Sequence, residues 1–512
     1  MSVPPTMVDA PTLESYDLIP YESIPIPATH PDALAAAARL AGLTPPPVEG
    51  CRVLELGAAS GGNLIPMAFY RPGNDYVGVD LSQRQVEDGS ALIAALGLAN
   101  VRLLHRDVAA GLTDLGRFDF VIAHGLYSWV PQALRARLLD LIAGVTAPGG
   151  IAYVSYNTLP GWRARAMVRD MLLHHVGSAR HPRARLALAQ EFLERMAPAF
   201  AALEAPDARL VAQELAYLRS APAGYLYHEY LEAENEPVLF TAFLEQARQA
   251  GLSYVGDAEF AADLGQGLDA KARAAVADYP QERRLQYYDF LALRPFRRSL
   301  LTPGAAGEAV LDPGRITELS LFADVGSDEE LDLTRDTPQT FRTATRTPFQ
   351  VSHPLTKAAL MVLSERFPSA LPYGELAATA RAVVATHGAP GLAEEPTRLA
   401  TELAALAGWR LVGLAPQAQD WPVEPGPRPR LHALARWQIS HGLAPAGIRH
   451  SALELDEAGR ALALLCDGEH DLPALASAMG DRWPEFTPEE ITVACARLLW
   501  TFARNGLFET PQ

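Results

Sequence analysis

Between residues 49 and about 160, short apolar runs alternate with longer segments in which apolar positions recur every three or four residues. The apolar runs occupy 51–56, 76–80, 101–104 and 118–123, and another follows Gly150. Runs of this length are typical of buried strands, and the segments between them are typical of helices. The alternation predicts an α/β fold with a doubly wound parallel sheet, in which ligands bind beyond the carboxyl ends of the strands.

A cluster of small residues ends the first apolar run. Gly57, Ala59 and Gly62 nearly match the spacing G-x-G-x-x-G, with alanine in the middle. Such a turn lets the backbone pass close to a nucleotide-like ligand and presents the N–H groups of the next helix to it. Asp80 ends the second run, 23 residues after Gly57, which is close to the spacing of a carboxylate that accepts ribose hydroxyls. A tight turn without a ligand, and a helix N-cap at Asp80, are the alternatives.

Polar residues also follow the third and fourth runs. Asp107 comes after the third run and His124 directly after the fourth. Because the carboxyl ends of parallel strands meet at one edge of the sheet, we expect Gly57, Asp80, Asp107 and His124 to lie along that edge. A turn residue is the alternative for Asp107, and a hydrogen-bonded histidine at a strand end is an equal alternative for His124.

Composition and charge narrow the function classes. The chain has 512 residues, 49% hydrophobic and 20% charged, with a net charge of −17, so we expect about three globular domains and no general nucleic-acid binding. No run approaches 18 uncharged apolar residues, and Met1 to Asp9 lacks the pattern of a secretory signal. Three distant cysteines form neither a disulfide framework nor a zinc site. These features indicate a cytoplasmic protein without a membrane span, and no metal site is predicted.

Several motifs together are similar to those of class I S-adenosylmethionine (SAM)-dependent methyltransferases. They are Glu55-x-Gly57, Asp80, Asp107 and Ala147-Pro148-Gly149-Gly150-Ile151. Others resemble the bacterial protein-lysine methyltransferases that carry a methyltransferase regulatory domain, among them rickettsial enzymes acting on outer-membrane proteins. These are Ser15-Tyr16-Asp17, Tyr21, Thr29-His30-Pro31, Gly61-Gly62-Asn63, Ala123-His124-Gly125, Tyr127-Ser128-Trp129-Val130-Pro131, Tyr153-Val154-Ser155-Tyr156-Asn157 and Pro160-Gly161-Trp162.

The resemblance implies SAM as the cofactor and S-adenosyl-L-homocysteine as its product. It also implies that Asp107 bonds the adenine amine and that Val108 packs beside the ring. The cofactor-binding residues expected are Glu55, Gly57, Ala59, Gly61, Asn63, Asp80, Leu81, Asp107, Val108 and His124. The residues expected at the transfer zone are Tyr16, Tyr21, His124, Tyr127 and Trp129. Aromatic faces attract a sulfonium or an ammonium group, but aromatic residues at strand ends also serve as packing.

Two segments outside the predicted sheet carry unusual charge patterns. Residues 161–185 contain six arginines and one aspartate, which suits either a helix face or seam, or a patch for an acidic partner or RNA. His228, Glu229, Glu232 and Glu236 form an acidic cluster among tyrosines, which suits either packing or the reception of a lysine side chain.

Five regions are expected along the chain. They are an N-terminal arm and lid (1–48), a SAM-binding methyltransferase domain (49–185), a helical regulatory domain (186–300), a mixed α/β region (301–415) and a mainly helical, winged-helix-like domain (416–512). In the fourth region, 316–322, 331–334 and 349–352 look like strands. The C-terminal domain lacks a basic recognition helix, so we expect it to dock a substrate or to form a homodimer rather than to bind DNA.

Three functions follow as hypotheses. The first is methyl transfer from SAM to a protein lysine, which needs alignment and a neutral amine but no metal. The second keeps SAM but transfers the methyl group to a small molecule or natural product. The third is a non-catalytic SAM-binding interaction protein. A nicotinamide oxidoreductase explains neither Glu55 nor Asp107, and the chain lacks a clear catalytic dyad for it.

Overall fold

The computed structural model describes residues 15–304, 309–387, 396–421 and 423–509. The chain divides into two compact units, of which the first comprises residues 1–23 and 43–310 and the second comprises 24–42 and 311–512. Residues 1–14 of the expected N-terminal arm lie outside the described residues. The rest of the arm is shared between the units, because 15–23 belong to the first and 24–42 to the second.

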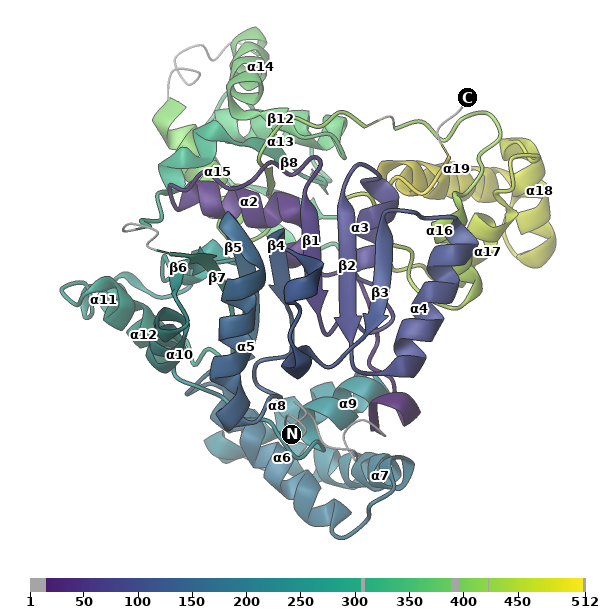
Figure 1. The fold of residues 1–512 in the computed structure, drawn as a ribbon. Coiled ribbons are helices and arrows are strands. Elements are labelled where there is room, and N and C mark those ends of the chain that lie inside the picture. The colour runs from purple at the N-terminus through teal and green to yellow at the C-terminus, as the bar shows by residue number, and fades with distance from the viewer. Residues whose placement is uncertain (1–14, 305–308, 388–395, 422, 510–512) are drawn as a thin grey trace. The chain divides into compact units, whose positions relative to one another are not determined.

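The first unit is built on one seven-stranded sheet with the order β3-β2-β1-β4-β5-β7-β6 (Figure 1). Its strands are β1 (Arg52–Leu56), β2 (Asp75–Asp80), β3 (Val101–His105), β4 (Phe118–Ala123), β5 (Thr146–Asn157), β6 (Leu252–Asp257) and β7 (Phe296–Pro303). Strands β1 to β5 are parallel, and β7 is antiparallel to both β5 and β6. The predicted α/β fold with a doubly wound, Rossmann-like sheet is confirmed.

The helices of the first unit follow the strands and then form a separate layer. They are α3 (Leu64–Tyr70), α4 (Gln83–Leu96), α5 (Gln132–Val145), α6 (Trp162–Val176), α7 (Pro182–Ala201), α8 (Pro206–Ser220), α9 (Ala223–Tyr230), α10 (Phe240–Gln249), α11 (Ala270–Ala274) and α12 (Gln281–Leu291). Figure 1 shows α6 to α9 beyond the carboxyl ends of the central strands. They share a core of their own that contains Val168, Leu193 and Leu215.

Local sequence explains the connection from β2 to α4. Ser82 caps α4 by accepting a hydrogen bond from the Gln85 backbone N–H at 3.2 Å. Gly97 ends the helix at a φ of 65°, a left-handed conformation in which a side chain would be strained. The N-cap is therefore Ser82, and the alternative role of N-cap for Asp80 is wrong.

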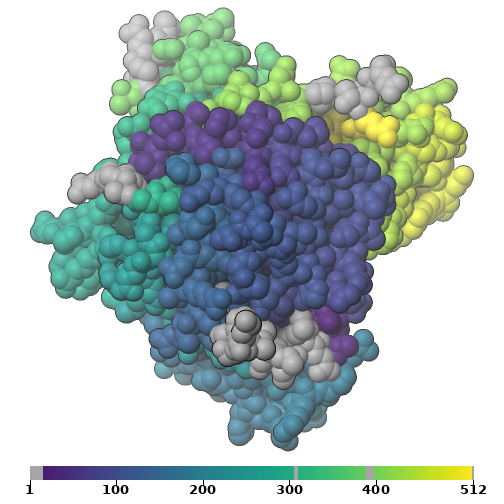
Figure 2. Space-filling view, in the orientation of Figure 1, coloured from purple at the N-terminus to yellow at the C-terminus, as the bar shows by residue number. Residues whose placement is uncertain are grey.

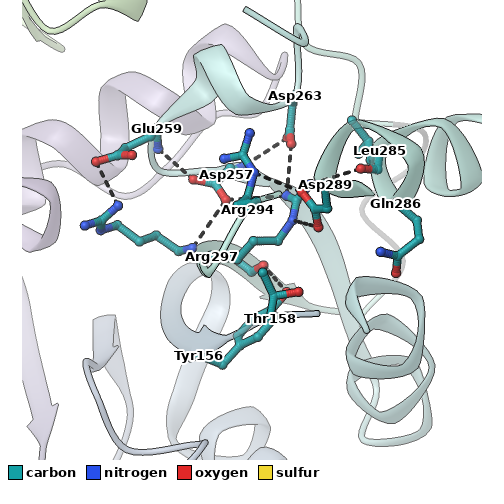
Figure 3. Close-up of polar contacts among 12 residues, drawn as sticks. Tyr156, Thr158, Asp257, Glu259, Asp263, Leu285, Gln286, Asp289, Arg294 and Arg297 are labelled. Carbon is teal, nitrogen blue, oxygen red and sulfur yellow. Dashed lines mark hydrogen bonds and ion pairs between the residues drawn. The ribbon is translucent and has the colours of Figure 1, made fainter. Parts of the chain in front are cut away.

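Strands β6 and β7 lie in the region that we expected to be helical. Most of 186–300 is helical, but these two strands complete the sheet of the methyltransferase unit. A strand with Arg297 and Arg298 does not look buried in sequence, yet Arg297 is fully buried. Its guanidinium pairs with Asp289 at 2.7 Å, Asp263 at 3.2 Å and Asp257 at 3.4 Å, as Figure 3 shows.

The second unit holds two three-stranded sheets and a set of helices. The strands are β8 (Ser320–Phe322), β9 (Val325–Gly326), β10 (Gln339–Thr343), β11 (Pro348–Val351), β12 (Leu371–Pro372) and β13 (Gly413–Ala415). The helices are α2 (Pro31–Leu40), α13 (Pro354–Arg366), α14 (Tyr373–Thr386), α15 (Pro396–Gly408), α16 (Ala433–Ser440), α17 (Glu457–Leu465), α18 (Leu472–Arg482) and α19 (Pro488–Arg504). Helix α2 is tied to this unit by Arg39, which donates to the Pro416 carbonyl, and by Asp32, which accepts from Gln419.

Two strand expectations in the second unit need correction. Residues 331–334 form no strand. Within 316–322, residues 316–318 belong to the 3-10 helix η5 (Pro313–Glu318), and only 320–322, which form β8, are extended. The Lys357 ammonium group, which is buried, donates to the Asp332 carbonyl at 3.0 Å, so tertiary contacts rather than strand pairing use that backbone. No helix among the described residues combines the length and the apolar character needed to span a lipid bilayer.

Candidate functional site

The sheet order brings four of the predicted residues to one edge. Strands β3, β2, β1 and β4 are consecutive neighbours and parallel, so their carboxyl ends lie side by side. Asp80 is the last residue of β2, and Gly57 and His124 follow β1 and β4 directly. Asp107 comes two residues after β3. This edge is where a doubly wound sheet binds its ligand.

The turn after β1 has the backbone conformation that its small residues predict. Gly57 has a φ of 77° and Gly61 a φ of 77°, and Ala59 has a positive φ of 48° despite its side chain. A Cβ atom added to Gly57 would meet only the Leu126 Cδ1 atom, at 4.0 Å. Gly57 therefore leaves its surroundings open to a ligand at the sheet edge.

Asp80 holds the turn and still has capacity for a ligand. Its Oδ2 atom accepts from the Ala59 backbone N–H at 2.7 Å, and its Oδ1 atom accepts from the Ser82 N–H at 2.8 Å. Burial raises the pKa of this carboxyl, and the backbone hydrogen bonds oppose that shift. Because an ionised carboxylate offers about four acceptor positions, roughly two remain for hydroxyl donors.

Glu55 in β1 has one buried oxygen atom without a donor. Only 3% of the residue is exposed. Its Oε1 atom accepts from the Asn63 amide at 2.8 Å, while Oε2 has no hydrogen-bond partner within the part of the chain that is described. Burial raises the pKa of Glu55 to about 8. A buried acceptor of this kind is costly unless a donor arrives from outside, and the ammonium group of SAM is such a donor. The residues present therefore fit SAM.

Three further predicted cofactor residues, Leu81, Asp107 and Val108, follow the carboxyl ends of β2 and β3. Asp107 Oδ1 accepts from the Ala109 backbone N–H at 2.8 Å and so begins the short 3-10 helix η2 (Val108–Ala110). Val108 is buried, and Leu81 is half-buried next to Asp80. The turn role of Asp107 is present, and its contact with adenine stays a prediction.

His124 is held by the neighbouring strand β5. Its Nδ1 atom lies 2.9 Å from the Tyr153 hydroxyl and 3.4 Å from the Ser155 hydroxyl. Burial, with a smaller effect of the Arg298 charge, lowers the pKa of His124 to about 4. The ring is therefore neutral at pH 7, so it orients neighbouring groups without adding charge.

An N-terminal segment that we call the strap, residues 15–23, connects this edge to α9. The Ser82 hydroxyl donates to Asp17 at 2.6 Å, and the Gly62 N–H donates to the Ser23 hydroxyl at 2.7 Å. At the other side the Tyr16 ring stacks on His228, with centroids 4.1 Å apart and an angle of 9° between planes. In the space-filling view the strap lies in dark purple against the blue helical layer (Figure 2). Tyr16 is thus brought next to the predicted edge.

His228 anchors the strap on α9. Its Nδ1 atom lies 2.9 Å from Glu232 Oε1 and its Nε2 atom 2.6 Å from the Ile19 carbonyl. The Ser15 hydroxyl donates to the same Glu232 oxygen. We did not predict His228 and Glu232 as anchors of the strap, although their spacing of four residues on a helix was a signal that their side chains face the same way.

Gly62 is a test of the contact between the strap and the turn. A Cβ atom added there would lie 1.9 Å from the Ser23 carbonyl oxygen, so Gly62→Ala is expected to displace the strap. We expect proteolysis within residues 15–23 to become about tenfold faster with unchanged helix content by circular dichroism. Gly73→Ala is the matched control, because a Cβ there meets nothing within 4 Å. Equal proteolysis of the two variants would contradict the contact.

Two predicted transfer-zone aromatics lie in different surroundings. Tyr127 is fully buried in the core between the sheet and α10, and its hydroxyl donates to Gln246 at 2.6 Å. Its ring packs edge-on against Phe243, with centroids 5.2 Å apart. Trp129 is half-buried. The structure therefore brings Tyr16 and Tyr21 to α9 and gives the Tyr127 side chain a packing role.

Three of the six arginines of residues 161–185, Arg165, Arg169 and Arg185, have contacts within the helical layer. Arg169 donates to the Glu232 and Ala233 carbonyls, and Arg185 donates to the Leu231 carbonyl. These carbonyls belong to the three residues that directly follow α9, which ends at Tyr230. The seam alternative explains these arginines better than a patch for RNA does.

Comparison with known protein families gives three matches along the chain. Residues 53–150 match a methyltransferase domain, residues 222–302 match a predicted methyltransferase regulatory domain, and residues 427–487 match a C-terminal winged helix domain of PKMT. The winged-helix-like expectation for the C-terminal region is thereby confirmed. The regulatory-domain match contains β6 and β7, so this domain supplies two strands of the sheet.

Relatives and solved structures agree with these matches. The chain is 37% identical over 289 residues to the uncharacterized protein RP789 of Rickettsia prowazekii, covering 56% of this chain and 52% of RP789, about half its length. It is 32% identical over 235 residues to RP028 of the same organism, covering 46% of this chain and 94% of RP028. The structure of PKMT2 from Rickettsia typhi in complex with AdoHcy has a TM-score of 0.84 at 24% identity, covering 96% of this chain and all of that one.

The sheet order, the glycine turn and the carboxylates at the sheet edge are those of the class I methyltransferase fold. The chain belongs to the bacterial methyltransferase family that combines this domain with the methyltransferase regulatory domain and the PKMT winged helix, the family that the sequence motifs predicted.

Proposed function

We propose that this protein transfers the methyl group of SAM to the side-chain nitrogen of a lysine in another protein. The observation that carries the proposal is the strap, which joins the sheet edge at Ser82 and Gly62 to the acidic, aromatic face of α9. Such a face would not attract an anionic or a neutral acceptor. A lysine ammonium group, in contrast, is attracted to both carboxylates and aromatic rings.

Different residues would hold different parts of the SAM molecule. Asp80 would accept the ribose hydroxyls, Glu55 Oε2 would accept from the ammonium group, and the backbone at Gly57 would pass close to the ligand. Asp107 and Val108 would lie at the adenine end, as the family resemblance implies. When bound, SAM would supply an electrophilic methyl group on its sulfonium centre. A neutral amine would attack this group in line, with S-adenosyl-L-homocysteine as the leaving group. The chain itself has to align the acceptor and keep water away. Alignment alone lowers the activation barrier by several kcal/mol.

Tyr16 and Tyr21 are the aromatic residues best placed for the acceptor. Burial raises the pKa of the Tyr16 hydroxyl, and the charges of Glu232, Asp80 and Glu229 add to this. Burial also raises the pKa of the Tyr21 hydroxyl. Both phenols therefore stay neutral at physiological pH and present aromatic faces to a cation. A displacement of the strap would remove both at once.

The name of PKMT2 and the PKMT winged helix support a protein acceptor for this chain. We place the reaction in the cytoplasm, because all three cysteines are free and buried. A homodimer through the C-terminal domain stays a prediction.

The test of the acceptor class is a fractionation. The full chain is incubated with bacterial lysate and SAM that carries a radioactive methyl group, and the label is counted in protein and in small-molecule fractions. We expect it in protein, and we expect Asp80→Ala to abolish it. Label that appears in small molecules other than SAM, and not in protein, would indicate that the acceptor is a metabolite and not a lysine.

A further inference from the structure

Glu229 on α9 differs from the acidic residues around it. No described residue donates a hydrogen bond to its side chain or forms an ion pair with it, although it is half-buried. Burial raises the pKa of Glu229 to about 7, and the charge of Arg165 only partly offsets that effect. A carboxylate that loses water without gaining a donor is unfavourable, so the site is suited to a cation that comes from outside the chain.

The neighbouring carboxylates already have partners. Glu232 accepts from Ser15 and lies beside the His228 ring, Glu214 accepts from the Tyr230 hydroxyl and lies 3.6 Å from Arg165, and Glu236 lies 3.7 Å from Arg135. The acidic cluster predicted from the sequence thus reduces to one carboxylate with both oxygens available.

Tyrosine side chains lie near Glu229 on α9 and beside it. Tyr225 precedes it by four residues on α9, so the two side chains lie on the same face of the helix. Tyr217 packs edge-on against Tyr225, with centroids 5.6 Å apart. Tyr217 is 49% exposed and Tyr21 is 37% exposed. An extended aliphatic side chain with a terminal ammonium group matches this combination of rings and carboxylate.

Tyr16 links this carboxylate to the cofactor edge. The charges of Asp80 and Glu229 both raise the pKa of its hydroxyl, so the ring lies within electrostatic reach of the two. The next residue, Asp17, is bonded to Ser82, which is two residues beyond Asp80. An acceptor ammonium group at Glu229 would therefore lie close to the strap, which leads from α9 to the edge that would hold SAM.

We propose that Glu229 binds the ammonium group of the acceptor lysine and takes its proton before methyl transfer. One N–H bond of the ammonium breaks and an O–H bond forms on the Glu229 carboxylate, which leaves a neutral amine whose lone pair attacks the methyl group. The N–C bond forms as the C–S bond of SAM breaks, the bond electrons stay on sulfur, and S-adenosyl-L-homocysteine leaves. The methylated amine then carries the positive charge, and Glu229 returns its proton to water. This role rests on the proposed function and assigns to one residue the deprotonation that the reaction needs.

The experiment uses the full chain with SAM and a pool of peptides, each with one central lysine in random sequence. The initial rate of methylation is measured between pH 7.0 and 9.5. The fraction of free lysine that is neutral rises roughly 300-fold over this range, so added alkali replaces an internal base. We expect Glu229→Gln to lower the rate at least about thirtyfold at pH 7.0 and less than about threefold at pH 9.5.

Glu234→Gln is the matched control, because Glu234 is exposed and carries the same change of charge five residues away. We expect it to follow the wild type at every pH. A second readout needs no turnover: calorimetry with the lysine pool and with a pool that has norleucine instead. Wild type should prefer lysine at least about tenfold, and Glu229→Gln should lose the preference. SAM affinity should be unchanged in both variants.

The outcomes separate the two proposals. If wild type methylates lysine and Glu229→Gln has the same pH profile, Glu229 is not the acceptor carboxylate and the proposed function stands. A Glu229→Gln rate that falls equally at all pH values indicates a structural role and overturns the proposal as well. If wild type methylates no lysine in the pool while it labels small molecules, both proposals fail together.

Discussion

Replacement of Asp80 by alanine is expected to lower the affinity for SAM by at least about 100-fold, because two charge-assisted hydrogen bonds to the ribose contribute about 1.5–3 kcal/mol each. The variant also loses the acceptor that fixes the Ala59 and Ser82 backbone N–H groups. The turn and the first residues beyond β2 then become free to move in the absence of the ligand. Both effects lower the affinity for SAM.

Calorimetric titration of the full chain with SAM measures this effect. Asp75→Ala is the matched control, because Asp75 starts the same strand and pairs there with Arg52 at 3.1 Å, far from the carboxyl end. We expect the control to bind SAM as the wild type does. An Asp80→Ala affinity within twofold of the wild type would remove Asp80 from the site.

Replacement of Arg297 by methionine is expected to destabilise the first unit by at least about 3–5 kcal/mol, the usual cost of removing one partner of a buried ion pair. Arg297 compensates Asp257, Asp263 and Asp289, and its guanidinium also lies 4.0 Å from the centre of the Phe240 ring. Without it, the partly buried Arg294, 2.9 Å from Asp289, would be the remaining arginine among the described residues that pairs with one of the three carboxylates. The strands β6 and β7 and helix α12 meet here.

Hydrogen exchange with mass spectrometry, followed through a urea titration, measures this unit separately from the other. We expect β6, β7 and α12 to lose protection at a much lower urea concentration in Arg297→Met. Arg248→Met is the control, since Arg248 is 54% exposed and pairs with Glu282 at the surface, where a pair contributes about 1 kcal/mol or less. Equal midpoints in the two variants would show that the buried pairs add nothing to stability.

Features that depend on neighbours in sequence could be predicted. The strand, turn and helix around Gly57 form one local unit, and Asp80 ends the next strand at a fixed distance along the chain. Parallel strands then place both at one edge whatever else the chain does. For this reason the fold class and the location of the candidate site followed from the sequence.

Features that depend on distant partners could not. Arg297 looks like a surface residue until the three carboxylates of 257, 263 and 289 are brought to it, and β7 was missed for this reason. The need for glycine at position 62 comes from Ser23, 39 residues earlier. Tyr127 looks like an active-site aromatic after β4, yet the partner of its hydroxyl is Gln246 on α10.

The most direct test of methyl transfer to protein lysine is tandem mass spectrometry of lysate proteins. The lysate is first incubated with the full chain and with SAM that carries a deuterated methyl group. We predict deuterated methyl groups on lysine side-chain nitrogens of a small number of proteins, and none when Asp80→Ala replaces the wild type. Deuterated methyl groups on other residue types only, or on no protein at all, would contradict a lysine methyltransferase.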